Sequence, residues 1–135
     1  MKFMTKNDFI VAFYSAFAKN ILPNDKKKYN ITIGKKGLLW DIFAAKLVPC
    51  YEGNNARTFF DTIDKTGAME IHYSGHNRFG KDDKATSVLS CNHMKSKYID
   101  DSGLIEFYVI GRNFEWCYVV THELDLCGPY FCFKQ

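Results

Sequence analysis

The residues best suited to acid–base chemistry in this chain are His122 and Glu123, which follow the apolar run that ends at Thr121. A histidine beside a carboxylate can titrate near neutral pH, where it takes up and releases protons readily. If the chain is a small cytosolic enzyme or a ligand-binding protein, His122 and Glu123 are its candidate catalytic residues. The competing interpretation is that these residues end a strand and bond to the backbone of the next loop. We expect this second, non-catalytic interpretation to hold.

Residue types that bind metals are present, but they are not spaced as in a zinc site: His72, His76, Cys91, His93, His122 and Cys127. Zinc ligands usually come in close pairs, such as CxxC or two histidines one helical turn apart. His72 and His76 have that separation, yet their segment is predicted to be a strand followed by a loop, where they would not share a face. No cysteine is singled out as the partner of a histidine in a nucleophilic pair. The sequence therefore predicts no metal and no other cofactor.

Basic residues concentrate in residues 1–98, which carry 16 Lys or Arg against nine Asp or Glu, whereas residues 99–135 carry two against six. Five of the lysines lie in segment 24–37. This segment lacks the spacing of a phosphate-binding loop, and it offers only Tyr29 for stacking against a base. We interpret it as a basic loop and expect no nucleic-acid partner. The opposite charges of the two parts suggest solvated faces or two unlike surfaces.

The five cysteines are odd in number and form no CxxC pair, which favours reduced thiols in a reducing compartment. Cys117 lies in an apolar run and is expected to be buried. The N-terminus imitates a signal peptide, with lysines before an apolar run and an Ala16-Phe17-Ala18 site. Asp8 interrupts the charged part and Tyr14 the apolar part, so we do not expect cleavage. No run reaches the ~18 apolar residues of a membrane span. The predicted location is the cytoplasm, away from membranes.

The clearest structural signal is a β-hairpin, formed by residues 104–110 and 114–121 around the turn Gly111-Arg112-Asn113. Both runs are rich in β-branched and aromatic residues, which are typical of strands. A chain of 135 residues with 47 % hydrophobic composition can bury a core without a disulfide or metal. We therefore expect residues 1–135 to form a single globular domain.

The remaining pattern predicts helices early and strands late. Helices are expected over 5–20, with Thr5 and Asp8 as a capping box, over 38–45, and over 54–64, capped by Asn54 or Asn55. Other expected elements are a strand at 68–74, a polar loop at 75–87, a segment at 88–94 that fits strand or helix, a turn at 99–103, and an edge strand at 130–133 after Pro129. The predicted fold class is α+β, with N-terminal helices packed on an antiparallel β-sheet built largely from the C-terminal half.

An ordered set of motifs resembles a family of small bacterial proteins, DUF4275, whose domain has no known function. The motifs span residues 38–131 and are Leu39-Trp40-x-Ile42-Phe43, Lys46-Leu47-x-x-Cys50-x-x-Gly53-x-x-Ala56-x-x-x-Phe60, Tyr108-Val109, Phe114-x-Trp116-x-Tyr118-Val119-x-Thr121-His122-Glu123 and Gly128-Pro129-Tyr130-Phe131. The chain departs from the family pattern in segment 75–98, which is more basic and richer in Gly and His. The resemblance implies a cytosolic bacterial α+β domain and brings no catalytic residue or cofactor.

By elimination, the expected function is non-catalytic protein binding, most simply that of an immunity or inhibitor protein that neutralises a bacterial toxin by covering its active site. Such proteins are short and rich in aromatic residues, although those that inhibit nucleases tend to be acidic, and this chain is basic. Aromatic anchors within a charged rim are typical of tight interfaces. The expected partner surface comprises loop 75–87 and the acidic stretch 100–125, with the candidate residues His76, Arg78, Lys81, Asp82, Asp83, Asp100, Asp101, Glu123 and Asp125.

Overall fold

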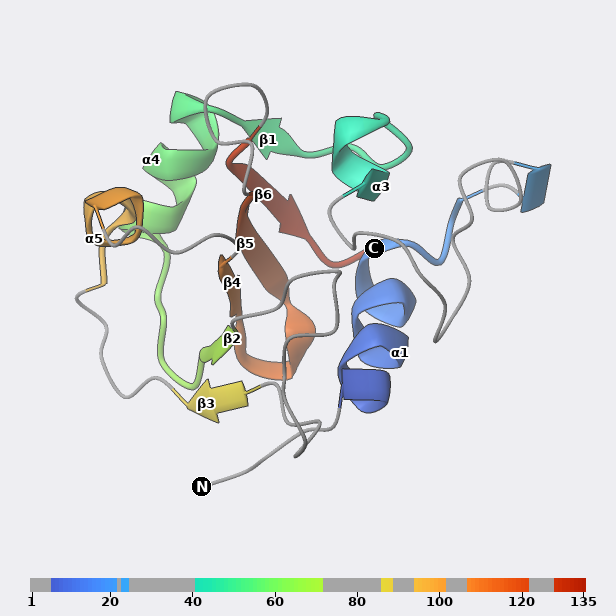
Figure 1. Ribbon diagram of the computed structural model, residues 1–135, viewed down its shortest axis with the longest axis horizontal. Coiled ribbons are helices and arrows are strands. Elements are labelled where there is room, and N and C mark those ends of the chain that lie inside the picture. Colours follow the sequence, from blue (N-terminus) through green and yellow to red (C-terminus); the bar gives the residue numbers. More distant parts are fainter. Residues whose placement is uncertain are drawn as a thin grey trace.

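The computed structural model describes residues 6–21, 23–24, 41–71, 86–88, 94–101, 107–121 and 128–135. In this part of the chain, six antiparallel strands form one sheet in the order β1-β6-β5-β4-β2-β3 (Figure 1). The strands are β1 Tyr51–Glu52, β2 Met69–Ile71, β3 Thr86–Val88, β4 Phe107–Ile110, β5 Trp116–Val120 and β6 Tyr130–Phe133. The helices are α1 Lys6–Phe17, α3 Asp41–Ala44, α4 Asn54–Thr62 and α5 Ser96–Asp101. This arrangement confirms the α+β class and the antiparallel sheet.

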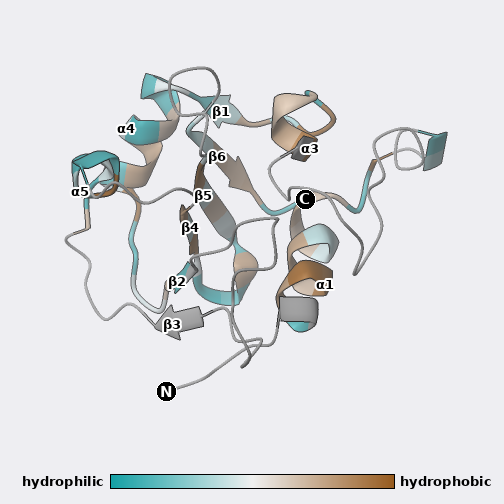
Figure 2. Ribbon diagram, in the orientation of Figure 1, coloured by the Kyte–Doolittle hydropathy of each residue, from teal (hydrophilic) through white to brown (hydrophobic). Residues whose placement is uncertain are grey.

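The central strands are buried on both faces. Along β4 and β5, side chains point alternately to two cores: Tyr108, Ile110, Cys117 and Val119 face one, and Phe107, Val109, Trp116, Tyr118 and Val120 face the other. Helix α1 covers the first face and α4 and α5 cover the second, so the sheet is the middle of three layers (Figure 1). Figure 2 shows the matching pattern, with hydrophobic residues on β4 and β5 and hydrophilic ones on much of α5.

The predicted hairpin is confirmed, because β4 pairs with β5 from Phe107 opposite Val120 to Ile110 opposite Cys117. Its first strand was expected to begin at 104, and residues 104–106 lie outside the described part. Phe114 was expected to be in the second strand, and that was wrong. Phe114 lies in a short 3-10 turn and has a φ of 56°, which takes its backbone out of the extended conformation.

The hairpin turn depends on Gly111, because the Trp116 indole packs directly over it. A Cβ atom at position 111 would lie 2.6 Å from two carbons of that ring. The glycine also donates its N–H to the Trp116 carbonyl at 2.8 Å, which closes the turn. A glycine is thus required here by close approach rather than by an unusual φ.

Helix α1 presents phenylalanine side chains every fourth residue to the sheet, because residues four apart lie on one helical face. Phe9, Phe13 and Phe17 are fully buried, and the first two meet the edge of Tyr108 at 6.0 and 5.9 Å. The helix ends before Pro23, as predicted. Thr5 lies outside the described residues, so its capping box stays a prediction.

Helix α4 confirms the prediction for 54–64 but corrects its cap. Gly53 is the N-cap, and it has no side chain with which to cap the helix. Its carbonyl accepts the first helical hydrogen bond from Arg57 N–H at 3.1 Å. Asn54 and Asn55 lie inside the first turn. In the 38–45 segment, α3 covers Asp41–Ala44, and residues 38–40 lie outside the described part.

Three other expectations need correction. The turn expected at 99–103 is helical up to Asp101, since Ile99 is buried in the core beneath α5. Thr86 and Ser87, expected in a loop, belong to β3, which pairs with β2. Strand β6 is not an edge strand, because β1 pairs with its outer side. Residues 72–85, 89–93 and 102–106 lie outside the described part, and so do the expectations for them.

No described helix has the length and apolar character needed to cross a membrane.

Candidate functional site

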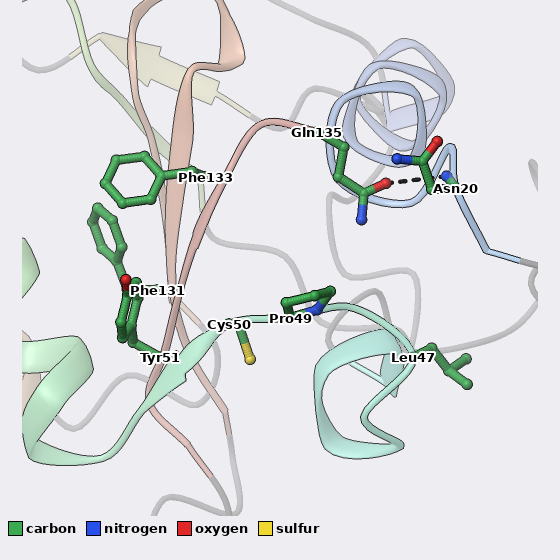
Figure 3. Close-up of a pocket in the computed structure, with 8 residues that line it drawn as sticks. All are labelled: Asn20, Leu47, Pro49, Cys50, Tyr51, Phe131, Phe133 and Gln135. Carbon is green, nitrogen blue, oxygen red and sulfur yellow. Dashed lines mark hydrogen bonds between the residues drawn. The ribbon is translucent and has the colours of Figure 1, made fainter.

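A hollow bordered by described residues lies beside β1, at the outer side of β6. Strand β1 pairs with β6 at Tyr130 and Phe131. Two residues before β1, the Pro49 carbonyl accepts a hydrogen bond from the Cys132 thiol of β6 at 3.5 Å. The hollow, called the β1–β6 cleft below, has a volume of about 700 Å³. It is lined by Asn20, Leu47, Pro49, Cys50, Tyr51, Phe131, Phe133 and Gln135. Figure 3 shows the aromatic rings at one end, Asn20 and Gln135 at the other, and Cys50 and Pro49 between them.

The aromatic end of the cleft is the outer part of a continuous column of rings. Tyr51 stacks on Phe59 with centroids 4.1 Å apart, and Phe59 stacks on Phe131 at 5.5 Å. Phe131 in turn stacks on the buried Trp116 at 5.5 Å. Each ring therefore holds the next one in place, and the column extends from the core to the surface.

Two rings at this end are exposed. Tyr51 is 43 % exposed and Phe133 is 47 % exposed, although both contact the column. Phe133 meets the edges of Phe131 at 5.1 Å and Phe59 at 6.0 Å. Large aromatic rings that are exposed yet fixed by packing lose little conformational entropy when a partner covers them, and such rings are the usual anchors of protein interfaces.

A second hollow adjoins the cleft on the other side of Phe133. It has a volume of about 280 Å³ and is lined by Ile63, Asp64, Thr66, Arg112, Glu115, Trp116 and Phe133. Asp64 accepts hydrogen bonds from the backbone N–H and the hydroxyl of Thr66, and these bonds lower the pKa of its carboxyl group. Phe133 thus stands between an apolar cleft and a smaller charged hollow.

The polar end of the cleft fixes the last strand to the first helix. Gln135 donates its backbone N–H to the Ala16 carbonyl at 2.9 Å, and its side-chain oxygen accepts the Asn20 backbone N–H at 3.1 Å (Figure 3). Nearer β1, Lys46 Nζ forms an ion pair with Glu52 Oε1 at 3.3 Å, and the Lys46 side chain is 80 % exposed. The cleft therefore has fixed walls at both ends.

The cysteines near the cleft are free, protonated thiols. Burial raises the pKa of Cys50 to about 11, with a smaller contribution from Glu52. Burial likewise raises the pKa of Cys132 to about 12 and that of Cys117 well above its usual value. A neutral thiol is a poor nucleophile and metal ligand, so these residues contribute apolar surface to the cleft and core. The expectation that Cys117 is buried is confirmed. Cys50, Cys117 and Cys132 are free, and Cys91 and Cys127 lie outside the described residues.

Two of the partner-binding candidates fall in the described part, both on α5. Asp100 forms an ion pair with Arg57 of α4, in which Arg57 Nε lies 3.1 Å from Asp100 Oδ2. A quarter of the Asp100 side chain is exposed. Asp101 pairs with Lys97 at 3.1 Å on the helix surface. The candidates outside the described residues are His76, Arg78, Lys81, Asp82, Asp83, Glu123 and Asp125, together with His122. The His122–Glu123 site therefore stays a prediction.

No group of three His, Cys, Asp or Glu residues in the described ranges could hold a metal ion.

The residues of the β1–β6 cleft were missed in the sequence, although a usable signal was present. Phe131 and Phe133 alternate within the last strand, so they lie on one face of the sheet. The sequence pattern did not indicate that β1 pairs with the outer side of β6. That pairing brings Tyr51 beside Phe131 and Phe133.

Comparison with known proteins gives one result. The model of a family described as a domain of unknown function, DUF4275, matches residues 7–131. Neither the curated proteins nor the solved structures contain a match to the chain.

Proposed function

Because this chain belongs to the DUF4275 family, whose domain has no assigned function, we propose its role from the β1–β6 cleft: it is a non-catalytic domain that binds another protein. The observation that carries this proposal is the exposure of Tyr51 and Phe133 on a column of stacked rings. Apolar surface left in water is unfavourable by about 25 cal/mol per Å². A partner that covers these rings gains that free energy without having to order them.

A protein fits this surface better than a small molecule does. The two exposed rings leave one wall of the cleft open, whereas small-ligand sites enclose most of their ligand. The hollow beyond Phe133 extends the surface with polar groups from Asp64, Arg112 and Glu115. An apolar centre beside polar groups is the usual anatomy of a protein interface.

Within this class, we propose the role of an immunity or inhibitor protein that neutralises a bacterial toxin in the cytoplasm. Its support comes from the sequence: one short chain, many aromatic residues, an odd number of cysteines and no catalytic signature. Loop 75–87 and the acidic residues up to Asp125 remain candidates for additional contacts with the partner.

The proposal can be tested by photo-crosslinking in the native host. A photoreactive phenylalanine analogue is placed at Tyr51 or Phe133, and Tyr98 of α5, which is 60 % exposed, serves as the matched control. We expect one discrete protein to be captured from positions 51 and 133 but not from 98. The captured protein, once purified, should form a stoichiometric complex that Phe133→Ser weakens at least tenfold.

If the captured protein is toxic when expressed alone, co-expression of this chain should restore growth, and the Phe133→Ser variant should restore it less. Equal capture from all three positions would contradict the proposed surface. Measurable turnover by the purified chain that His122→Ala abolishes would favour the enzyme interpretation instead.

A further inference from the structure

We propose that Cys50 and Cys132 form a redox pair: exchange with a small-molecule disulfide joins the two thiols in a reversible cross-strand disulfide beside the β1–β6 cleft. The pair is defined by the strand register, by the face of the sheet that both side chains share, and by the access that the cleft gives to Cys50. This modification is independent of any partner protein.

The register of β1 and β6 places Cys50 opposite Cys132. Tyr51 lies opposite Phe131, and in an antiparallel pair the residue before one faces the residue after the other. The Pro49 carbonyl, whose carbon is bonded to the Cys50 nitrogen, accepts a hydrogen bond from Cys132 Sγ at 3.5 Å. The chain therefore still lies beside β6 at Cys50, although strand β1 itself begins only at Tyr51.

The register also determines how close the two side chains lie. Antiparallel pairs alternate between hydrogen-bonded positions and non-hydrogen-bonded positions, and side chains are closer at the second kind. Gly53 donates its N–H to the Pro129 carbonyl at 2.9 Å, which makes that pair hydrogen-bonded. Three positions along, Cys50 and Cys132 therefore occupy a non-hydrogen-bonded site. The usual Cα separation at such a site is about 4.5 Å, which is within the range that a disulfide requires.

Both thiols lie on the same face of the sheet. Cys132 belongs to the core under α1, and Cys50 packs against that core. Their strand neighbours Tyr51 and Phe131 lie on the opposite face, where Phe59 stacks on both rings. A bond between Cys50 and Cys132 would thus join two side chains that already point to one region.

Cys117, the other thiol neighbour of Cys132, is less suited to a disulfide. It lies opposite Cys132 in the register of β5 and β6. Lys134 donates its N–H to the Glu115 carbonyl at 2.9 Å, which makes that pair hydrogen-bonded. The Cys117–Cys132 pair, two positions along, is therefore also of the hydrogen-bonded kind, and its side chains lie farther apart. Cys117 is fully buried, whereas Cys50 lines the cleft.

The cleft lets a small oxidant reach Cys50, which is half-buried (Figure 3). The Cys50 thiolate attacks one sulfur of a disulfide such as oxidised glutathione, the S–S bond breaks, and the leaving thiolate takes up the proton that Cys50 lost. Cys132 then loses its proton and attacks the Cys50 sulfur, and the second small thiolate leaves and takes up that proton. The net reaction oxidises two protein thiols and reduces one disulfide to two small thiols.

The first of these two steps limits the rate. Burial raises the pKa of Cys50 to about 11, so little thiolate is present at neutral pH. The second step is intramolecular, and the register gives it a high effective concentration. The pair therefore stays reduced during brief exposure to small disulfides and becomes linked when they persist.

The test incubates the full chain with reduced and oxidised glutathione at pH 8, blocks the remaining thiols with N-ethylmaleimide and maps the disulfides by mass spectrometry. We expect a link between Cys50 and Cys132 that dithiothreitol reverses. The linked protein should unfold at a urea concentration about 1 M or more above that of the reduced protein, because the link joins positions far apart in the sequence.

Three variants separate this pair from the other thiols. Cys132→Ala should stop at the mixed disulfide of Cys50 with glutathione, and Cys50→Ala should leave Cys132 reduced. Cys117→Ala is the matched control and should form the Cys50–Cys132 link within about twofold of the wild-type rate, since it changes the hydrogen-bonded neighbour only. Circular dichroism checks that each variant is folded, and the mapping of the wild type stands without them.

Two results for the wild type would overturn the redox pair. One is a link from Cys132 to Cys117 in place of Cys50. The other is a folded chain that ends with glutathione on Cys50 and a free Cys132. A Cys50–Cys132 link that is no more abundant in the folded chain than in urea would also overturn it, because the register would then not select the pair.

Discussion

Cys50 is the thiol that lines the cleft, and its chemistry follows from its surroundings. Its pKa is raised from 9.0 to about 11, chiefly by burial, so the protonated form dominates at neutral pH. Two pKa units lower the thiolate fraction about a hundredfold, and the greater nucleophilicity of the remaining thiolate offsets part of that loss. We predict that Cys50 reacts with iodoacetamide at pH 7.5 at least tenfold more slowly in the folded protein than in urea.

The rate should keep rising with pH up to about 11, whereas an ordinary thiol levels off near pH 9. Peptide mapping by mass spectrometry follows Cys50 separately from the other cysteines. Equal rates for the folded and unfolded chains at pH 7.5 would show that the thiol is not buried as described.

Lys65 is a second residue whose environment disfavours its charge. The side chain is 1 % exposed, its ammonium lies 4.6 Å from the centre of the Phe60 ring, and it donates to the Ile63 carbonyl at 3.2 Å. Burial, and then the nearby Lys95, lower its pKa. At Lys65 the folded protein therefore binds a proton more weakly than the unfolded chain does. The free energy of unfolding of the wild type rises with pH between the lowered pKa of Lys65 in the folded state and 10.5, its ordinary value.

We predict that Lys65→Met stabilises the fold by about 1 kcal/mol at pH 7, because a buried charge is replaced by an apolar side chain of similar length. The advantage should shrink between neutral pH and pH 10.5, as the wild-type amine loses its charge. Urea denaturation across this range measures it, with Lys97→Met as the exposed control, expected within about 0.5 kcal/mol of wild type. A gain that grows with pH would contradict the stated cause.

At the scale of elements, α5 depends on a neighbouring helix for its start. Six residues are too few to form a stable helix alone. Asp61 of α4 accepts hydrogen bonds from the Ser96 N–H at 2.7 Å and from the Ser96 hydroxyl at 3.0 Å. This carboxylate acts as an N-terminal cap supplied from another part of the chain.

We predict that Asp61→Ala destabilises the protein by about 1–2 kcal/mol and speeds hydrogen exchange of the α5 amides more than of the β5 amides. Asp101→Ala is the control on the same helix. It removes only the exposed pair with Lys97, which is worth at most about 0.5 kcal/mol. The cap assignment is wrong if the two variants have equal effects.

The elements that could be predicted from the sequence are those whose pattern is local. The β4–β5 hairpin, α1 and α4 follow from alternation or helical spacing within one segment. Strand β1 was not identified, since a two-residue strand has no period, and α5 was missed because its cap comes from Asp61. The position of β6 inside the sheet depends on its pairing with β1, which no feature of Tyr130–Phe133 indicates. The cleft escaped prediction for the same reason, as it is created by that pairing.

At the scale of the whole molecule, the central strands link the two cores. Phe13 lies in the core under α1, and Phe60, stacked on Tyr118 at 4.1 Å, lies in the core under α4. Strands β4, β5 and β6 contribute alternate side chains to both. Loss of packing on one face therefore loosens the backbone that supports the other, and the sequence-based prediction of a single domain has a direct test.

We predict that Phe13→Leu and Phe60→Leu each lower the free energy of unfolding by about 1–2 kcal/mol, since each removes part of a buried ring, and that each variant still unfolds in one transition. In a Trp40→Phe background, Trp116 fluorescence reports the core under α4, while far-UV ellipticity reports all helices and strands. The two signals should coincide for both variants, even though Phe13→Leu changes the opposite face. If Phe13→Leu shifts the ellipticity curve and leaves the Trp116 curve unmoved, the two cores are separate cooperative units and the strands do not couple them. Coincident curves instead mean that the cleft, whose ring column continues from Trp116, keeps its geometry only while both cores are intact.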